Sequence, residues 1–247
     1  MAKYLMKKED RATFNKSGNI KLGNTWNFST VYGNELKSVF FNGAKYEAVG
    51  TCGKYCQGCK KDCYVKKSYR YPSVVYSHIK NTLAMRLNPA AAFNDLGAAI
   101  ENAKTKPEII RINQSGELEN ITIFRGWCDL ARKYPKIKFW LYSKAYNIII
   151  PELLAGNVPE NMTVLISIWH NFGLKEYKKV QHLSNVKAFV YDDGYDYKSQ
   201  GVNIQTYCEA YKIKDGKMKL NHNITCDKCR KCFNRAAGCK VIGSLPH

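Results

Sequence analysis

The residues best suited to chemistry in this chain are its ten cysteines, most of which occur in two dense runs. Four lie within twelve residues, and three more stand near the C-terminal end: Cys52, Cys56, Cys59 and Cys63, then Cys226, Cys229 and Cys232. Thiolates two or three residues apart can converge on one soft metal centre, because a short loop turns the backbone around them. The spacing therefore predicts two metal centres in preference to disulfides or buried free thiols.

The N-terminal residues bear on the compartment. Charges at Lys3, Lys7 and Lys8 interrupt every apolar stretch there, and neither a signal peptide nor a membrane span is expected. We expect a cytoplasmic protein. Thiols stay reduced in the cytosol, which again favours metal or redox sites over a disulfide framework.

Charge composition limits the range of partners. Lys and Arg number 39 against 20 Asp and Glu, giving a net charge of +19 and a sequence pI near 9.5. Such an excess attracts polyanions, so nucleic acid is a candidate partner. Two simpler causes of the excess also stay open, since cations near a cluster offset thiolate charge and surface lysines improve solubility.

The segments before and after the first cysteine run differ in their sequence patterns. Residues 13–50 combine turn signals with short aromatic and β-branched runs, which predicts strands and hairpins. After Cys63, apolar residues at helical spacing predict one helix over 74–87 and, beyond Pro89, a second over 91–103.

Strand-like and helix-like runs then alternate along the chain, and they predict an α/β fold with a parallel sheet. The expected strands are 109–112, 137–142, 163–168 and 186–191, separated by expected helices at 121–133, 148–155 and 175–183. Tyr46 to Val49 is placed ahead of them as strand one, and Val202 to Gln205 is a candidate sixth strand. The strand count suits either an open doubly wound sheet or a partial (β/α) barrel.

Both architectures collect their chemistry at the carboxyl ends of the strands. The second predicted strand runs into Gln114, Ser115, Gly116 and Glu117. Gly116 would permit close approach of a ligand, and Glu117 could bind an ammonium group. These four residues are the candidate cofactor-binding residues.

Two motifs resemble those of radical S-adenosylmethionine enzymes. Cys52-x3-Cys56-x2-Cys59 is similar to their cluster motif, and Ser115-Gly116-Glu117 is similar to their second-strand Gly-Gly-Glu motif. The resemblance implies a partial, TIM barrel-like fold and a four-iron cluster whose open iron binds S-adenosylmethionine. Cys63 is near enough to occupy that iron instead.

A closer resemblance is to the bacteriophage gene product 88 family of iron-sulfur proteins. It rests on Thr51-Cys52, on Cys59-x3-Cys63-Tyr64, on Ile110 to Glu117, on Phe139 to Lys144, and on Cys208 followed by the C-terminal run. It covers about four fifths of the chain, from Thr51 onward. The family implies two [4Fe-4S] clusters on a radical-enzyme-like scaffold, and the host cytoplasm as the location, but it carries no settled reaction.

That resemblance also implies a ligand assignment. Cys52, Cys59 and Cys63 become the ligands of the first cluster, and Cys56 is an additional thiol that would close the cluster if it bound. The second cluster takes Cys226, Cys229 and Cys232, with a fourth ligand that is Cys208 by resemblance or Cys239 by proximity in sequence.

We expect three regions: a β-rich extension over 1–44, a partial βα barrel over 45–206 and a cysteine-rich segment over 207–247. Three functions remain open. The first is a redox-active iron-sulfur protein, whose electron donor is unknown and which nucleic acid could contact. The second is a radical enzyme that uses S-adenosylmethionine. The third is a nucleic-acid-binding module with structural metal sites, zinc being the competing metal.

Overall fold

Apolar runs of four to eight residues build the centre of the structure. In this computed structural model, residues 11–15, 21–56, 59–170, 172–214, 217–221, 223–235 and 238–245 are described. Four strands, β4 (Ile109–Ile112), β5 (Lys138–Ser143), β6 (Met162–Trp169) and β7 (Val186–Tyr191), pair in chain order and run parallel. They are apolar because both faces of a parallel sheet are covered.

Short strands from distant parts of the chain extend the sheet at both sides. β1 (Trp26–Asn27) pairs with β4, β11 (Val241–Ser244) pairs with β7, and β8 (Thr206–Tyr207) pairs with β11. The order is β1-β4-β5-β6-β7-β11-β8. The fold is therefore α/β with a mainly parallel seven-stranded sheet, and within the described residues the sheet does not close into a barrel.

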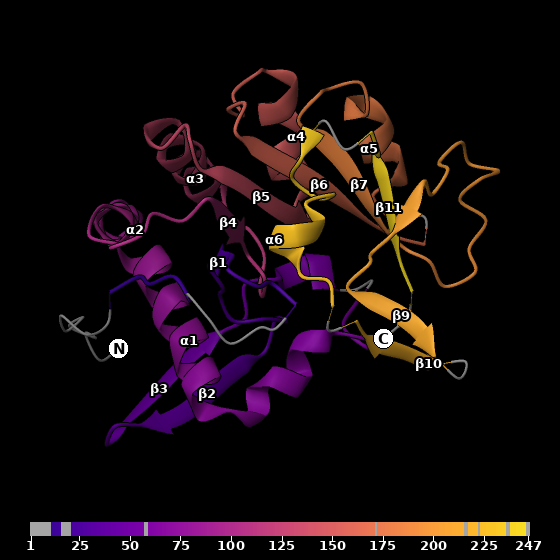
Figure 1. Ribbon diagram of the computed structural model, residues 1–247. Helices are drawn as coiled ribbons and strands as arrows, with labels where there is room; N and C mark the ends of the chain where they lie inside the picture. The colour runs from indigo at the N-terminus through magenta and orange to yellow at the C-terminus, as the bar shows by residue number, and fades with distance from the viewer. Residues whose placement is uncertain are drawn as a thin grey trace.

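Four helices cover one face of this sheet (Figure 1). They are α2 (Pro89–Glu101), α3 (Ile121–Lys133), α4 (Tyr146–Leu154) and α5 (Leu174–Val180). Side-chain caps fix two starts: Asn88 accepts a hydrogen bond from the Ala91 amide, and Asn120 accepts one from the Ile123 amide. Their apolar residues form the main core with the sheet.

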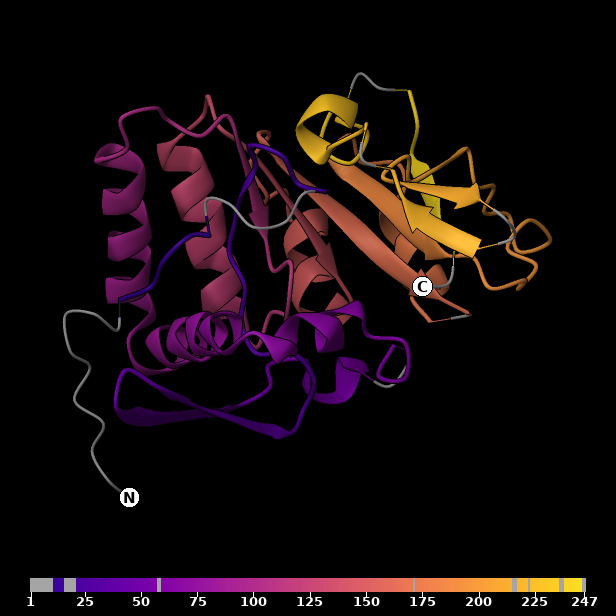
Figure 2. The ribbon, with the colours of Figure 1, turned by 60° about the horizontal axis from the view of Figure 1, so that its bottom comes forward.

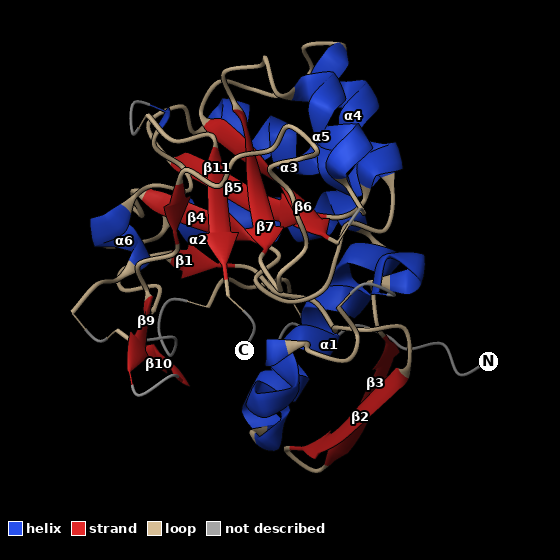
Figure 3. Ribbon diagram, turned by 90° about the vertical axis from the view of Figure 1, so that its right-hand side faces the viewer, coloured by secondary structure: helices blue, strands red, loops and turns tan. Residues whose placement is uncertain are grey.

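In sequence, the first cysteine run lies between a β-hairpin and a long helix, and Figure 3 shows these two elements side by side. β2 (Leu36–Phe41) and β3 (Ala44–Val49) pair antiparallel and pack on α1 (Pro72–Leu87). Two 3-10 helices, η2 (Gly53–Cys56) and η3 (Tyr64–Arg70), connect β3 to α1. This hairpin, with α1 packed on it, positions the cysteine loop beside the sheet.

The opposite face of the sheet is covered by the described residues between 208 and 240, the C-terminal segment (Figure 2). The segment contains β9 (Tyr211–Lys214), β10 (Lys217–Leu220) and the single-turn α6 (Cys226–Cys229). Phe233 stacks on Trp140 of β5 with ring centroids 4.7 Å apart. Buried Lys187 of β7 donates hydrogen bonds to the Lys231 and Asn234 carbonyls, at 2.6 and 2.8 Å.

Most predicted elements are confirmed. The alternation from residue 109 to 191 gives β4, α3, β5, α4, β6, α5 and β7 within a few residues of the expected limits. The helices predicted after Cys63 are α1 and α2, and the N-terminal hairpin is β2–β3. Of the expected extension, residues 11–15 and 21–44 are described. Strands from both ends of the chain lie in the central sheet, and the three-region division stays a prediction.

Two strand assignments were wrong. Tyr46 to Val49 lies in β3, which pairs with β2 outside the central sheet, and β1 occupies the place next to β4. Val202 to Gln205 has no strand structure, and β11 takes the sixth position. Both errors concern pairings distant in sequence.

No helix among the described residues is long and apolar enough to cross a bilayer.

Lys187→Met tests how the C-terminal segment is held. The change leaves two carbonyls without their donor, so we expect the free energy of unfolding to fall by about 1–3 kcal/mol. Urea denaturation followed by circular dichroism measures it. Lys179→Met, at a half-exposed position on α5, is the matched control and should stay close to wild type. Equal stability of the two variants would contradict this role for Lys187.

Candidate functional site

Side chains alternate between the two faces of the central strands, and this alternation separates core from site. Ile110 and Ile112 of β4 belong to the core beneath the helices. Ile109 belongs to a smaller apolar cluster beneath the C-terminal segment, together with Trp140 and Phe233. Arg111 therefore projects to that second face, where the cysteines also gather.

Three cysteines of the first run line a cavity of about 400 Å³ at the carboxyl ends of the strands. They are Cys52, Cys59 and Cys63, the first cysteine group. Cys52 is fixed from both sides, since its amide donates to the Gly33 carbonyl at 2.9 Å and its sulfur accepts from the Gly33 amide at 3.2 Å. The backbone at Gly33, just before β2, thus sets the position of this thiol.

Cys56 is placed differently. Its thiol is buried and donates a hydrogen bond to the Gly53 carbonyl at 3.1 Å, within η2. It does not line the cavity. The structure therefore brings together the three cysteines that the family resemblance implies and turns the additional one toward its own backbone.

The cavity also holds all four predicted cofactor-binding residues, Gln114, Ser115, Gly116 and Glu117. The Glu117 carboxylate accepts hydrogen bonds from the Ser143 hydroxyl, the Lys144 amide and the Leu118 amide, at 2.7 to 2.9 Å. Burial raises the pKa of Glu117 although these donors oppose the shift. Glu117 therefore joins the end of β4 to the end of β5, and ammonium binding stays a prediction.

Gly116 has a structural explanation. Its φ is +80°, and a Cβ there would overlap the Thr30 hydroxyl. The Thr30 and Thr51 hydroxyls hydrogen-bond at 2.9 Å, and Thr51 accepts from the Glu117 amide at 2.9 Å. The glycine thus admits this threonine pair against the strand end; contact with a ligand stays a prediction.

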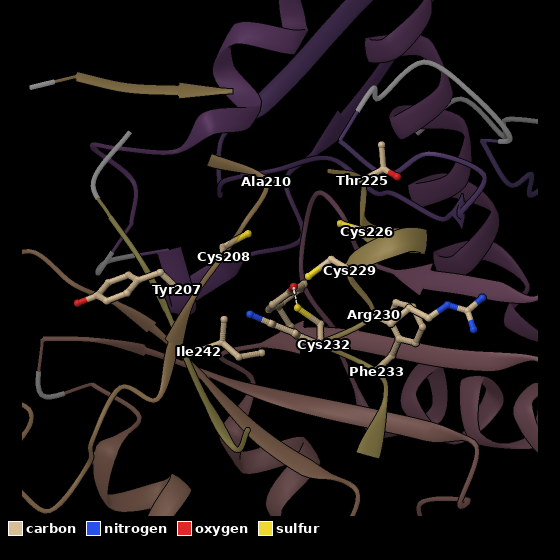
Figure 4. A pocket seen from close by; sticks show the side chains of 12 residues that line it. Tyr207, Cys208, Ala210, Thr225, Cys226, Cys229, Arg230, Cys232, Phe233 and Ile242 are labelled. Carbon is tan, nitrogen blue, oxygen red and sulfur yellow. Dashed lines mark hydrogen bonds between the residues drawn. The ribbon is translucent and has the colours of Figure 1, made fainter. Parts of the chain in front are cut away.

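A second cysteine group lies in the C-terminal segment. Figure 4 shows the side chains of Cys208, Cys226, Cys229 and Cys232 directed toward a common space, which they line with Tyr142 and Phe233. Cys239 does not line this space and is buried in the apolar cluster beside Trp140. Of the two candidates for a fourth ligand, Cys208 is therefore the one grouped with the other three.

Burial raises the pKa of some thiols in each group. It raises the pKa of Cys52, with Glu117 adding to the rise, and it raises the pKa of Cys63 and Cys226. Burial also raises the pKa of Cys232 to about 12, although the Tyr142 hydroxyl donates to its sulfur at 2.9 Å and opposes the shift. Such thiols stay protonated at neutral pH until a metal displaces the proton.

Cations lie beside each group. Burial lowers the pKa of Lys144, but Cys59 and Glu117 outweigh it and the net pKa is raised. Arg111 lies between the two groups, with its guanidinium 4.7 Å from the centre of the Tyr142 ring. Tyr142 lines both the large cavity and the space of the second group, so it forms the wall between them.

Sequence reasoning missed Arg111 and Lys187. A usable signal was present, because Arg111 and Lys187 each interrupt an otherwise apolar strand, and a charge in a buried strand needs a reason. The basic residues next to the first group are all exposed: Lys60, Lys61, Lys66, Lys67 and Arg70. Nucleic-acid binding stays a prediction.

No three His, Cys, Asp or Glu side chains among the described residues are arranged to hold a single metal ion. That geometry differs from a four-iron cluster, in which each thiolate binds a different iron and the sulfurs stand farther apart. The donor sets fit a cluster in chemistry: three thiols in one group and four in the other.

Comparison with known sequences gives one relationship. The sequence profile of the gene product 88 family matches residues 6–235. No curated protein and no solved structure matches the chain.

Gly116→Ala tests the packing role of the strand end. We expect a loss of about 2 kcal/mol or more in the free energy of unfolding, because a positive φ and an overlap with Thr30 combine. Gly156→Ala is the control, since φ there is +71° but nothing lies within 4 Å of the added Cβ. Thermal denaturation measures both, and equal losses would contradict the overlap.

His78 predicts a loss of stability in acid. Burial lowers the pKa of His78 to about 4, below its ordinary 6.5, and its Nδ1 lies 3.2 Å from the hydroxyl of Tyr69 in η3. The folded state favours the neutral ring, so stability is complete above pH 6.5 and falls as the pH drops toward 4. The loss between pH 7 and pH 4 is about 3 kcal/mol.

Urea denaturation at a series of pH values measures this dependence. His78→Asn should be less stable at pH 7 and lose this part of the pH dependence, whereas His182→Asn, at an exposed position, should retain it. An unchanged slope between pH 6.5 and 4 in His78→Asn would contradict the assignment.

Proposed function

The chain belongs to the gene product 88 family, a phage gene-product family, and we propose that it is an iron-sulfur protein that holds two [4Fe-4S] clusters. Its function would be redox activity at these two cysteine-ligated centres. When bound, such clusters supply one-electron transfer, and the residues around them tune its potential.

One observation carries the proposal: seven cysteines separate into a group of three and a group of four on either side of Tyr142. Chance burial would scatter thiols through the core, as it does Cys128, which is buried in α3. Groups of three and four thiols from short loops are typical of iron-sulfur sites, whereas structural zinc sites commonly pair two separated Cys-x2-Cys units.

The second group would be the closed centre. Cys208, Cys226, Cys229 and Cys232 supply four thiolates, which leaves no exchangeable position on a cluster. The room that they line is about 20 Å³, so a cluster requires the sulfurs to spread. The segment that would have to move is short, because α6 has a single turn. Its first residue is held in place, since the Cys226 amide donates a hydrogen bond to the Lys21 carbonyl at 2.8 Å. Tyr142 would donate a hydrogen bond from its hydroxyl to the Cys232 sulfur there.

The first group favours a second candidate function, radical chemistry with S-adenosylmethionine. Three thiols face the large cavity and Cys56 is turned away, so a cluster there would keep one exposed iron. The consecutive order of β4 to β7, with helices on one face, is the arrangement of a partial (β/α) barrel and supports the likeness to radical enzymes. Lys144 beside Cys59 would offset the cluster's negative charge.

Serine variants and anaerobic iron analysis test the proposal. Cys59→Ser and Cys229→Ser should each lose about half of the bound iron and sulfide, because each removes one ligand set. Cys56→Ser and Cys128→Ser are matched controls and should retain the wild-type content. Electron paramagnetic resonance of the reduced protein assigns each lost signal to a site.

The same spectra separate the two candidate functions. A signal that changes on addition of S-adenosylmethionine, and that disappears in Cys59→Ser, would favour the radical enzyme. Two clusters that do not respond would favour a redox role alone. Protein that binds zinc and no iron would overturn both.

A further inference from the structure

We propose that the large cavity binds a small organic anion, with Arg111 holding its charged group and the aromatic wall of the cavity holding a planar body. The inference does not rest on the presence of clusters, because it concerns the side chains of the strand ends. It assigns a ligand class to a cavity that also contains the first cysteine group.

Arg111 is the anchor. Its side chain is on a central strand and is 9% exposed, yet no carboxylate among the described residues pairs with it. Its Nη2 makes one long hydrogen bond, 3.4 Å to the Tyr64 hydroxyl, and its buried Nε has no partner. The groups that act on Arg111 through their charge are the hydroxyls of Tyr64 and Tyr142 and the thiols of Cys226 and Cys232, and all four are neutral while protonated. A buried guanidinium is always charged, and leaving it without a counter-ion is costly. The geometry therefore calls for an anion at this point.

The other charges of the cavity do not supply that anion. Both carboxylate oxygens of Glu117 already accept hydrogen bonds, from the Leu118 and Lys144 amides and from the Ser143 hydroxyl. Asp62 lines the cavity but is an exposed residue. Lys21 and Lys144 add positive charge to the same walls. While the cavity's thiols are protonated, its lining has three cationic side chains against two acidic ones, which favours an anionic ligand.

Aromatic rings form the rest of the wall. Trp169 and Tyr191, at the ends of β6 and β7, stack with centroids 3.8 Å apart. Phe189 and Tyr142 meet edge to face at 4.8 Å. All four line the cavity, whose volume of about 400 Å³ is in the range that holds a small molecule. A planar body such as a purine or a benzene ring matches walls of this kind.

Isothermal titration calorimetry with two matched probe pairs tests the ligand class. AMP is compared with adenosine, and benzoate with benzamide, so that each pair shares a planar body and differs in charge. We expect the anion of at least one pair to bind about tenfold or more tightly than its neutral partner, since a charge-assisted hydrogen bond carries the difference. The pair that binds distinguishes a phosphate from a carboxylate.

Variants then assign the anion to Arg111. Arg111→Gln should remove the advantage of the anion and leave binding of adenosine or benzamide unchanged, while Arg111→Lys should retain part of it. Arg132→Gln, at an exposed position on α3, is the control. Tryptophan fluorescence of Trp169, read as the difference from Trp169→Phe, gives an independent signal of cavity occupancy in the wild-type protein.

Three results would overturn the proposal. The first is that neither AMP nor benzoate binds better than its neutral partner. The second is that Arg111→Gln folds and binds the anion with wild-type affinity. The third is that Arg111→Gln lowers the iron content of the second cysteine group and leaves anion affinity unchanged, in which case Arg111 is the counter-ion of thiolates. Because these probes are read without reference to iron, failure here is distinct from failure of the iron-sulfur proposal.

Discussion

The need to cover the second face of the sheet is the constraint on which the rest of the structure depends. β4 to β7 are buried on both faces, but their helices cover only one. A parallel sheet cannot leave the other face to water. The C-terminal segment provides the cover with little regular structure, and it is held by a stacked pair, Trp140 with Phe233, and by the two hydrogen bonds of Lys187. Cys232 lies between the two carbonyls that Lys187 holds, so fold stability and the position of the second cysteine group have the same cause.

The same constraint explains why polar side chains occur in apolar strands. A face packed only by side chains of a helix would accept leucine or valine at every inward position. Here the face meets carbonyls, thiols and a cavity, and Arg111, Tyr142 and Lys187 each contact one of them. Departures from an apolar pattern at buried positions are expected where a site requires them. The three residues are thus better indicators of function than the polar loops, whose polarity needs no special reason.

The sequence predicted the parts of the fold that depend on local pattern. Each strand from β4 to β7 is a mainly apolar run, and each intervening helix has its own periodicity, so neighbouring residues alone decide the element. Tyr46 to Val49 has equally good strand character, yet it pairs in a hairpin because β2 adjoins it, and a local pattern does not specify a partner. β1 and β11 join the sheet from opposite ends of the chain, and two or four residues carry too little periodicity to show it.

For the candidate site, the sequence predicted the spacing of the cysteines but not the orientation of their side chains. Cysteine spacing indicated which thiols lie in one loop, and Cys52, Cys56 and Cys59 are equivalent by that measure. Orientation separates them: the η2 turn directs Cys56 onto the Gly53 carbonyl, while Cys52 is held by Gly33 at the cavity wall. In the proposed cluster, ligation by three thiols would leave one iron exchangeable, whereas ligation by four would close the cluster. The chemistry of the first group therefore depends on a backbone turn of four residues, which no count of cysteines reveals.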